Sequence, residues 1–423
     1  MERLPGFRDF YPEPLPSNDV WSADLRTYVF DTWRSVARSY GFSEYDGPPL
    51  EPTDLFTKKS GDEIVGQLYN FTDKGDRAVA LRPEMTPTLA RMAAAAERNY
   101  KKPFKWFSIP QLFRYERQQK GRLREHFQLN CDILGEDSTA ADAELIALLI
   151  DTLRALGLSS EDFVVRLSSR NAWQDFFEAH CKDPDRAYEF FQVIDKLERE
   201  DPEVSDTKLA SLGFAPEEVR EFIRAGRPTP ELAGILEDLA ARGLRDFVRV
   251  DYGVIRGLAY YSGPVFEAFD RKGEFRAIAG GGRYNQLISL ISDGKVDLPA
   301  LGFGMGDVVL TELLKSRGLL PEMRGDIDVF FLIEDEQLRH ASLRQIQQLR
   351  EDGYNVEFPL TPSKGNKQFK RAMELGADFT VRLEGHMAVV KNLRTRAEMR
   401  LAPEELTEHL VDAIVDNMDE DEL

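Results

Sequence analysis

The chain has 423 residues, more than the length at which one hydrophobic core stops growing, so at least two domains are expected. With 42% hydrophobic and 30% charged residues it has the composition of a globular protein, and its net charge of -19 argues against indiscriminate binding to nucleic acids or anionic membranes. Its two cysteines, Cys131 and Cys181, exclude a disulfide framework and a cysteine-based zinc site. No stretch has the composition of a signal peptide or the length of a membrane span, so we expect a soluble, cytoplasmic protein with no membrane partner.

The first predicted element is a helix over residues 20–40, where apolar side chains recur at helical spacing up to Gly41. An extended stretch follows over residues 42–56, and its Pro48 and Pro49 restrict it to an edge strand or a bend. A helix that leads into an edge strand is typical of a subunit contact, but equally of the surface of a monomer. The sequence leaves both interpretations open.

Residues 67–92 predict two strands around a turn, followed by a helix from Thr88. Arg82, Glu84 and Thr86 alternate where the second strand ends. A carboxylate and a hydroxyl at the start of a helix can bind an ammonium group. In the alternative interpretation, Thr86 caps the helix and Glu84 interacts favourably with its N-terminus.

The segment 113–135 predicts a strand, a charged loop and a return strand. The cations of the loop suit a polyanion such as a nucleoside triphosphate. In the return strand, a side-chain period of two places short polar side chains on one face and apolar side chains on the other. We expect this polar face to form the floor of a polar pocket, the alternative being an exposed hairpin with a charged tip; it consists of His126, Gln128, Asn130 and Asp132.

A long apolar helix is expected over residues 140–156, and amphipathic helices with Pro and Gly breaks predict a helical insertion over about residues 168–245. Strand sequence then returns. The paired tyrosines Tyr260 and Tyr261 at a strand start are more often core or interface residues than ligand-binding residues. Further on, GGGRYNQL and the alternating glycines of ALGFGMG predict backbone that a ligand can approach closely.

After Pro321 a separate domain of about a hundred residues is expected, because strand and helix patterns alternate there. Four cations cluster at the start of its second helix: Lys364, Lys367, Lys370 and Arg371. The helix dipole disfavours cations at this end, so the cluster points to phosphate binding; the alternative is a solvated helix face.

These segments together resemble the histidyl-tRNA synthetases, which are class II aminoacyl-tRNA synthetases, over nearly the whole chain. The resemblance rests on LPGFRDFYP, LRPEMT, FRYERQQKGRLRE, RGLAYYSGPVFE, GGGRYNQL and the C-terminal region. It implies an α+β fold with a catalytic domain over residues 1–322, formed by an antiparallel sheet flanked by helices and carrying the helical insertion. It also implies an α/β anticodon-binding domain over residues 326–423 and a homodimer, with Pro48 in the position of the family's first motif.

The resemblance further implies a histidine–tRNA ligase that uses ATP and Mg²⁺ to activate L-histidine as an adenylate and transfers it to the 3′ end of tRNA(His). The implied catalytic residues, against the α-phosphate and the histidine carboxylate, are Arg114 and Arg256. The implied histidine-binding residues are Glu84, Met85, Thr86, Arg114, Gln128, Asp132, Arg256, Tyr260 and Tyr261. The implied ATP-binding residues are Arg114, Glu116, Arg122, His126 and Arg256, and no residue is expected to bind a metal directly.

Four positions depart from the family's pattern: Gln118 replaces a usual proline and Ala259 a common aspartate, and two further departures, at Val309 and His126, concern ATP. Class II enzymes usually carry an arginine on the γ-phosphate at the head of the last helix of the catalytic domain, where this chain has Val309. Another cation has to substitute for it, and Arg122 is one candidate. His126 stands where an aromatic ring usually lies under adenine, and imidazole can also stack there.

Two alternatives to this function follow from the same resemblance. One is a catalytically silent paralogue that senses histidine as a regulatory subunit of ATP phosphoribosyltransferase; it would keep the histidine pocket without the cations for ATP or the C-terminal domain. Arg114, Arg122, Arg256 and the C-terminal region favour the ligase, whereas Val309 favours the regulatory subunit. The other is a synthetase for a different amino acid, which Gln128, Asp132 and RGLAYY argue against.

Overall fold

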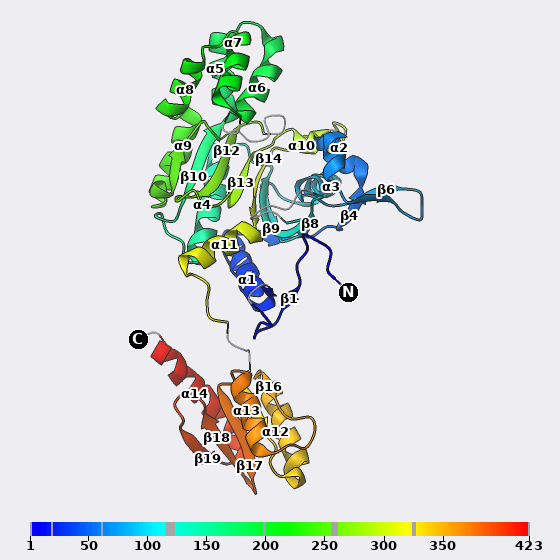
Figure 1. Cartoon of the computed structure of the whole chain (residues 1–423), viewed down its shortest axis with the longest axis vertical. Helices are drawn as coiled ribbons and strands as arrows, with labels where there is room; N and C mark the ends of the chain where they lie inside the picture. The colour runs from blue at the N-terminus through cyan, green and yellow to red at the C-terminus, as the bar shows by residue number, and fades with distance from the viewer. Residues whose placement is uncertain are drawn as a thin grey trace. The chain divides into compact units, whose positions relative to one another are not determined.

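The computed structural model describes residues 2–17, 20–60, 62–115, 123–197, 200–254, 261–323 and 327–421. The chain divides into two compact units, which are described separately (Figure 1). The first comprises Met1–Phe10 and Leu25–Pro321, and the second comprises Tyr11–Asp24 and Glu322–Leu423. Among the described residues, no helix combines the length and the apolar character needed to span a membrane.

The first unit is built on a nine-stranded sheet in the order β11-β10-β12-β13-β14-β9-β7-β3, with β8 paired to β9. Its central strands run antiparallel, and the pairs β10–β11 and β3–β7 are parallel. The strands are β3 (Ser43–Glu44), β7 (Phe104–Ser108), β8 (Gln111–Phe113), β9 (Glu125–Leu134), β10 (Phe163–Ser169), β11 (Val248–Val250), β12 (Pro264–Asp270), β13 (Ala279–Arg283) and β14 (Ala300–Gly306). The predicted fold class, a mainly antiparallel sheet flanked by helices, is confirmed.

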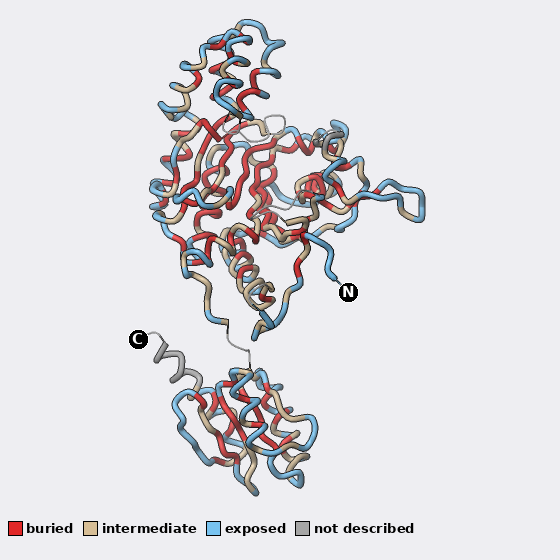
Figure 2. The backbone as a smooth tube through the Cα atoms, in the orientation of Figure 1, coloured by how far each residue is buried: buried red, intermediate tan, exposed pale blue. Residues whose placement is uncertain are grey.

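One face of this sheet is packed against helices. Alternate residues of β9 and β14, such as Leu129, Cys131 and Phe303, belong to the largest hydrophobic core, as the period of two requires. The helix α4 (Thr139–Ala155) lies against these strands and is buried along most of its length, because its apolar side chains occur all round the helix (Figure 2). The predicted helices over 140–156 and 20–40 are thus confirmed, the latter as α1 (Ala23–Ser39).

A second layer lies beside the strands β7 and β9. The helices α2 (Thr53–Ser60), α3 (Thr86–Ala96) and α10 (Leu287–Ile291) contact one another there, and α3 and α10 share a core with β7. A three-stranded sheet in the order β4-β6-β5 adjoins them, formed by β4 (Leu50–Pro52), β5 (Asn70–Thr72) and β6 (Ala78–Leu81). The two strands predicted within residues 67–92 are therefore present.

The predicted helical insertion is also present. Its helices are α5 (Arg170–His180), α6 (Ala187–Lys196), α7 (Pro202–Ser211), α8 (Pro216–Ala225) and α9 (Pro230–Ala241). Proline stands at the N-terminus of α7, α8 and α9, where a missing N–H costs no hydrogen bond. Aromatic rings form the core of the insertion, with Phe190 between Trp173 and Phe214.

The second unit contains a five-stranded sheet in the order β16-β15-β17-β18-β19. Its elements are β15 (Val329–Leu332), α12 (Arg339–Glu351), β16 (Val356–Glu357), α13 (Gly365–Glu374), β17 (Phe379–Glu384), β18 (Met387–Asn392), β19 (Glu398–Leu401) and α14 (Leu406–Asp421). The alternating strands and helices match the prediction up to β18. Neither β19 nor α14 was predicted; β19 has a charged, mostly exposed sequence without a strand-like alternation.

A buried ion-pair cluster attaches the N-terminal segment to the sheet of the first unit. Arg8 donates through Nε to Glu125 Oε1 at 2.6 Å and through Nη1 to Asp307 Oδ2 at 2.8 Å. All three side chains are almost completely buried. Asp307 begins the helix α11 (Asp307–Arg317) and also accepts a hydrogen bond from Phe127 N, so this cluster fixes the start of α11 against β9.

We expect Arg8→Ala to lower the free energy of unfolding of this unit by about 3–5 kcal/mol, because it leaves two carboxylates buried without their cation. Arg3→Ala is the matched control, since Arg3 forms an exposed ion pair with Asp9 and its loss should cost at most about 1 kcal/mol. Urea unfolding of both variants measures the difference. Equal stability of the two variants would contradict the anchoring role of Arg8.

Candidate functional site

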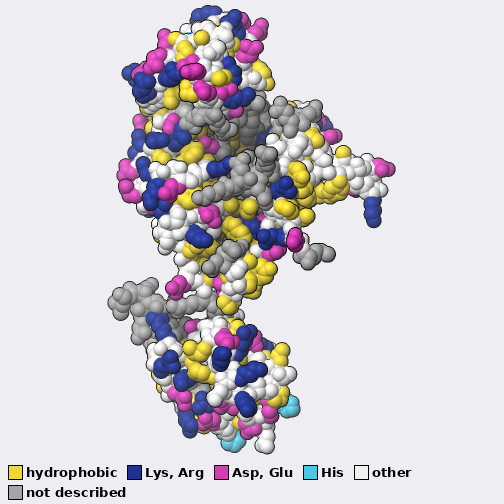
Figure 3. All heavy atoms as spheres, viewed as in Figure 1, with side chains coloured by type: hydrophobic (Ala, Val, Ile, Leu, Met, Phe, Trp, Pro, Cys, Tyr) yellow, Lys and Arg dark blue, Asp and Glu magenta, His cyan; other side chains and the backbone are white. Residues whose placement is uncertain are grey.

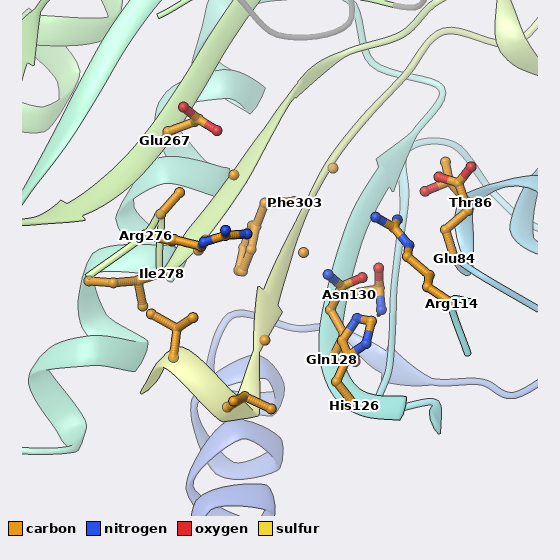
Figure 4. Close-up of a pocket in the computed structure, with 18 of the residues that line it drawn as sticks. Glu84, Thr86, Arg114, His126, Gln128, Asn130, Glu267, Arg276, Ile278 and Phe303 are labelled. Carbon is orange, nitrogen blue, oxygen red and sulfur yellow. Dashed lines mark hydrogen bonds between the residues drawn. The ribbon is translucent and has the colours of Figure 1, made fainter. Parts of the chain in front are cut away.

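A cavity of about 710 Å³ opens on the face of the sheet that α4 does not cover. The residues that line it come from α2, the start of α3, the end of β8, most of β9, the β12–β13 hairpin with the residues that flank its two strands, and the junction of β14 and α11 (Figure 4). The described lining residues include three cations and three carboxylates: Lys59, Arg114, Arg276, Glu84, Asp132 and Glu267. The cavity is therefore a polar pocket with both signs of charge.

The strand β9 supplies one wall of this pocket. His126, Gln128, Asn130 and Asp132 all line it, and the alternate residues Leu129, Cys131 and Ile133 lie in the core. The predicted division of this strand into a polar and an apolar face is thus confirmed. The side chains are short because the face is enclosed: Asn130 and Asp132 are only 5% and 4% exposed.

Beside this wall, β14 and β13 form a floor that has no side chains. Gly302, Gly304 and Gly306 of β14 lie opposite Asp132, Asn130 and Gln128 of β9 in the strand register. A Cβ atom at Gly302 would lie 1.8 Å from Asp132 Oδ1, and one at Gly304 would lie 2.7 Å from Gln128 Cδ. A side chain at either position would therefore require Asp132 or Gln128 to move. The alternating glycines therefore leave room for the polar side chains of β9, and the backbone of β14 is open to a ligand.

The buried end of the pocket is organised around Asp132. The hydroxyl of Tyr284 donates a short hydrogen bond to Asp132 Oδ1, and both side chains are almost completely buried. Burial raises the pKa of Asp132 to about 7, although the hydrogen bond from Tyr284 and the charge of Lys59 act in the opposite direction. A carboxyl group with such a raised pKa in a cleft is a feature of functional sites.

Glu84 forms a second acidic position nearer the side of the pocket formed by α2 and α3. It makes an ion pair with Lys59. Burial alone would raise the pKa of Glu84, but the charges of Lys59 and Arg114 outweigh it and lower the pKa below the ordinary value. Arg114 is held by a hydrogen bond of 3.1 Å from its Nε to Pro83 O, and its guanidinium points into the pocket (Figure 4). Glu84 is therefore a fixed anion that a cationic group can bind.

Thr86 also lines the pocket, as the first residue of α3. The alternative prediction that Thr86 caps this helix is wrong. The N-cap position is Met85, and its side chain makes no capping hydrogen bond. The hydroxyl of Thr86 thus belongs to the pocket wall, next to Glu84 (Figure 4).

The structure brings together most of the predicted site residues that it describes. Glu84, Thr86, Arg114, His126, Gln128, Asp132 and Tyr261 all line the pocket. Met85 does not: its side chain is fully buried in the core, with Sδ 3.7 Å from Arg82 Nη1. Glu116, Arg122, Arg256 and Tyr260 lie outside the described residues.

Four polar or charged residues of the described lining were missed from the sequence: Lys59, Glu267, Arg276 and Tyr284. A signal for Tyr284 existed, because Gly280, Gly282 and Tyr284 share the pocket face of β13 at a period of two. Glu267 could have been found from the register of β12, where it lies opposite Gly280. Lys59 and Arg276 come from a helix and a hairpin loop that reach the pocket only through tertiary packing, and no local pattern marks them.

The fold and this pocket define a class II aminoacyl-tRNA synthetase. Residues 21–306 match the family model described as Histidyl-tRNA synthetase. The chain is 43% identical to a histidine–tRNA ligase of Opitutus terrae, covering 96% of this chain and 97% of the relative, and 38% identical to one of Leptospira biflexa, covering 94% and 93%. It superimposes on the crystal structure of apo S. aureus histidyl-tRNA synthetase with a TM-score of 0.73 at 25% identity, covering 97% of this chain and 100% of the other.

The chain belongs to the histidyl-tRNA synthetase family. The family model alone spans more than half of the chain, and the identity to the relative from Opitutus terrae extends over nearly the whole length of both proteins.

We expect Asp132→Asn to become more stable relative to the wild type as the pH rises from about 4 to 8. An acid with a raised pKa in the folded state contributes stability below its unfolded pKa and loses it as the pH rises through its folded pKa of about 7. Over roughly three pKa units the difference reaches about 4 kcal/mol at most. Urea unfolding of both proteins at pH 5, 6.5 and 8 measures it. The amide oxygen of the variant would still accept the hydrogen bond from Tyr284, so a pH-independent difference would contradict the raised pKa.

Proposed function

We propose that this chain is a histidine–tRNA ligase that activates L-histidine with ATP and transfers it to the 3′ end of tRNA(His). One observation carries the proposal beyond family membership. Asp132 and the amides of Gln128 and Asn130 share one cavity with Arg114, next to the glycine floor of β14. A small polar amino acid and a nucleotide can therefore lie in contact there. The alternative, a histidine-sensing regulatory subunit, accounts for the acidic end but not for Arg114 beside it.

Histidine is proposed to bind at the acidic end. Glu84 attracts the α-ammonium group, with Thr86 and Gln128 as further hydrogen-bond partners. Asp132 accepts a hydrogen bond from the imidazole N–H, and Tyr261 lies on the same side of the pocket. Asp132 favours histidine over an apolar amino acid, because an apolar side chain would leave the buried carboxylate without a partner. The proposed role of Tyr260 beside these residues rests on the family resemblance.

Activation requires no general base, because the attacking carboxylate of histidine is already ionised. One of its oxygens forms a bond to the α-phosphorus of ATP, and the bond from that phosphorus to the bridging oxygen of the β-phosphate breaks, so pyrophosphate leaves with the electron pair. Arg114 is placed to hold the two anions together and to stabilise the charge on the α-phosphate oxygens. Arg256 is proposed to share this role, and Glu116, Arg122 and His126 are proposed to bind ATP. The hydroxyl at the tRNA 3′ end then displaces AMP.

Mg²⁺ fits this pocket as an ion that enters with the nucleotide. The described residues contain no group of three or more His, Cys, Asp or Glu side chains that could hold a metal by themselves. Mg²⁺ normally binds through one or two carboxylates together with substrate phosphates, and Glu267 is a carboxylate of the pocket wall that would serve. When bound, Mg²⁺ would neutralise phosphate charge; the positioning of histidine is left to the side chains of the chain.

The two parts of the chain are proposed to divide the work on tRNA. Residues 1–322 would carry catalysis, and residues 326–423 would read the anticodon. The C-terminal unit supports this role through the exposed cations of α13, and Lys and Arg side chains gather on its visible face (Figure 3). By family resemblance we also propose that the protein is a cytoplasmic homodimer.

The ligase and the regulatory subunit differ in one assay. We expect histidine-dependent exchange of pyrophosphate into ATP with histidine alone among the amino acids. Histidine binding without exchange would refute the ligase and favour the regulatory subunit.

Glu84→Gln should raise the KM for histidine roughly ten- to a hundredfold by removing a charged hydrogen-bond partner of the ammonium group. Glu161→Gln, at an exposed carboxylate, is the control and should leave the KM unchanged.

For the C-terminal unit, we expect the double variant Lys367→Ala/Lys370→Ala to weaken tRNA binding roughly three- to tenfold and to reduce the slope of log K against log salt by about 1.5. Pyrophosphate exchange should not change, because it needs no tRNA. Filter binding over a salt series measures the effect. The control Lys272→Ala/Lys295→Ala removes the same charge from exposed sites of the first unit. Equal losses of tRNA affinity in both double variants would refute a specific role for α13.

A further inference from the structure

The pocket has a distal side that the proposed histidine-binding and catalytic residues do not occupy. From β9, the floor extends over β14 to β13, which is two strand spacings or about 10 Å. Lys59, Glu84 and Arg114 lie on the near side of this floor, beyond β9. On the distal side the described lining includes Glu267 of β12 and Ile278, which directly precedes β13 (Figure 4).

Arg276 is the cation that the described chain places on this distal side. It lines the pocket from the β12–β13 hairpin, and its side chain extends toward the middle of the cavity from the side opposite Arg114 and His126 (Figure 4). Val309, in the first turn of α11, also lines the pocket but has no group that can bind phosphate.

The hairpin that carries Arg276 is held firmly. Asp270 is 4% exposed and accepts hydrogen bonds from the backbone N–H groups of Lys272 and Glu274, at 3.2 and 2.8 Å. Arg317 of α11 makes an ion pair with Asp270. On the other side of Arg276, Ile278 N donates to Ala268 O at 2.8 Å. Anchors before and after Arg276 thus keep it at the pocket rim.

We propose that Arg276 binds the distal phosphates of ATP and so replaces the arginine that the family resemblance leads one to expect at position 309. This proposal rests on the proposed use of ATP by this chain. A nucleoside triphosphate carries about four negative charges, whereas Lys59 is already paired with Glu84. A nucleotide whose α-phosphate lies against Arg114 extends along the glycine floor, and its far end meets the guanidinium of Arg276, which can bind two phosphate oxygens at once.

The test compares direct binding of ATP and of AMP to the full-length wild type and to Arg276→Ala. AMP lacks the distal phosphates, so we expect Arg276→Ala to weaken ATP binding roughly ten- to a hundredfold and to leave AMP binding within about twofold. Arg276→Lys keeps the charge but not the planar fork, so it should fall between the two. The control Lys272→Ala removes an exposed cation from the same hairpin and should match the wild type.

Three results would overturn the proposal: unchanged ATP binding in Arg276→Ala, an equal loss for ATP and AMP, or an equal loss in Lys272→Ala. Arg276→Gln removes the charge but retains a polar side chain, and it gives the same comparison if the alanine variant does not fold. Because binding is measured without turnover, the outcome is independent of pyrophosphate exchange. A wild type that binds ATP through Arg276 but shows no exchange with histidine would refute the ligase and retain this site.

Discussion

The site depends on the steric requirement that β14 carry no side chains on its pocket face. Asp132 and Gln128 occupy the space in which Cβ atoms of Gly302 and Gly304 would otherwise lie. Larger residues at these positions would displace the polar wall of β9 and cover the backbone at the same time. The glycines therefore serve two purposes, since they admit the short polar side chains and leave a flat surface between the two ends of the pocket. The glycines of β13 extend this surface, because Gly280 and Gly282 pair with Gly304 and Gly302.

Keeping this surface rigid requires buried charges elsewhere in the unit. Arg283, the next residue after Gly282, points away from the pocket and donates to Asp142 of α4 at 2.6 Å and to Asp137 at 3.0 Å. Arg8 similarly holds the head of α11 through Asp307. Both arginines are almost completely buried and paired. Their guanidinium groups therefore neutralise carboxylates whose burial without a cation would lower the stability of the fold. The two ends of the glycine floor are thus fixed from the side of the sheet opposite the ligand.

The sequence alone predicts much of this unit, for reasons that differ from element to element. The polar wall of β9 was predictable because strand alternation is local, and the helix α4 because its apolar run is long. The sequence left two roles open for Thr86, since a hydroxyl at a helix start is usually a cap and only the position of the sheet shows that it faces the pocket. Lys59 and Arg276 could not be predicted, because contacts distant in sequence bring them to the pocket. Met85 lies between two pocket residues, yet the turn into α3 directs its side chain to the core.

The distribution of charge explains how so acidic a chain can use anionic substrates. The formal charge of -19 repels polyanions, but at physiological ionic strength salt screens this repulsion beyond about 8–10 Å. Within that distance, the positions of individual charged groups determine whether an anion binds.

In the pocket, Lys59 is held by Glu84, and Arg114 and Arg276 lie at opposite sides of a floor made of uncharged backbone. A nucleotide bound as proposed would meet Arg114 and Arg276 at the two ends of its phosphate chain, whereas a ligand without phosphates would lack this compensation against the acidic surface. The same division between long and short range holds for α13, where Lys370 and Arg371 share the single carboxylate of Glu374 at 3.7 and 3.8 Å and a local excess of positive charge results. The acidic surface thus opposes indiscriminate binding, and specificity arises from the positions of a few cations.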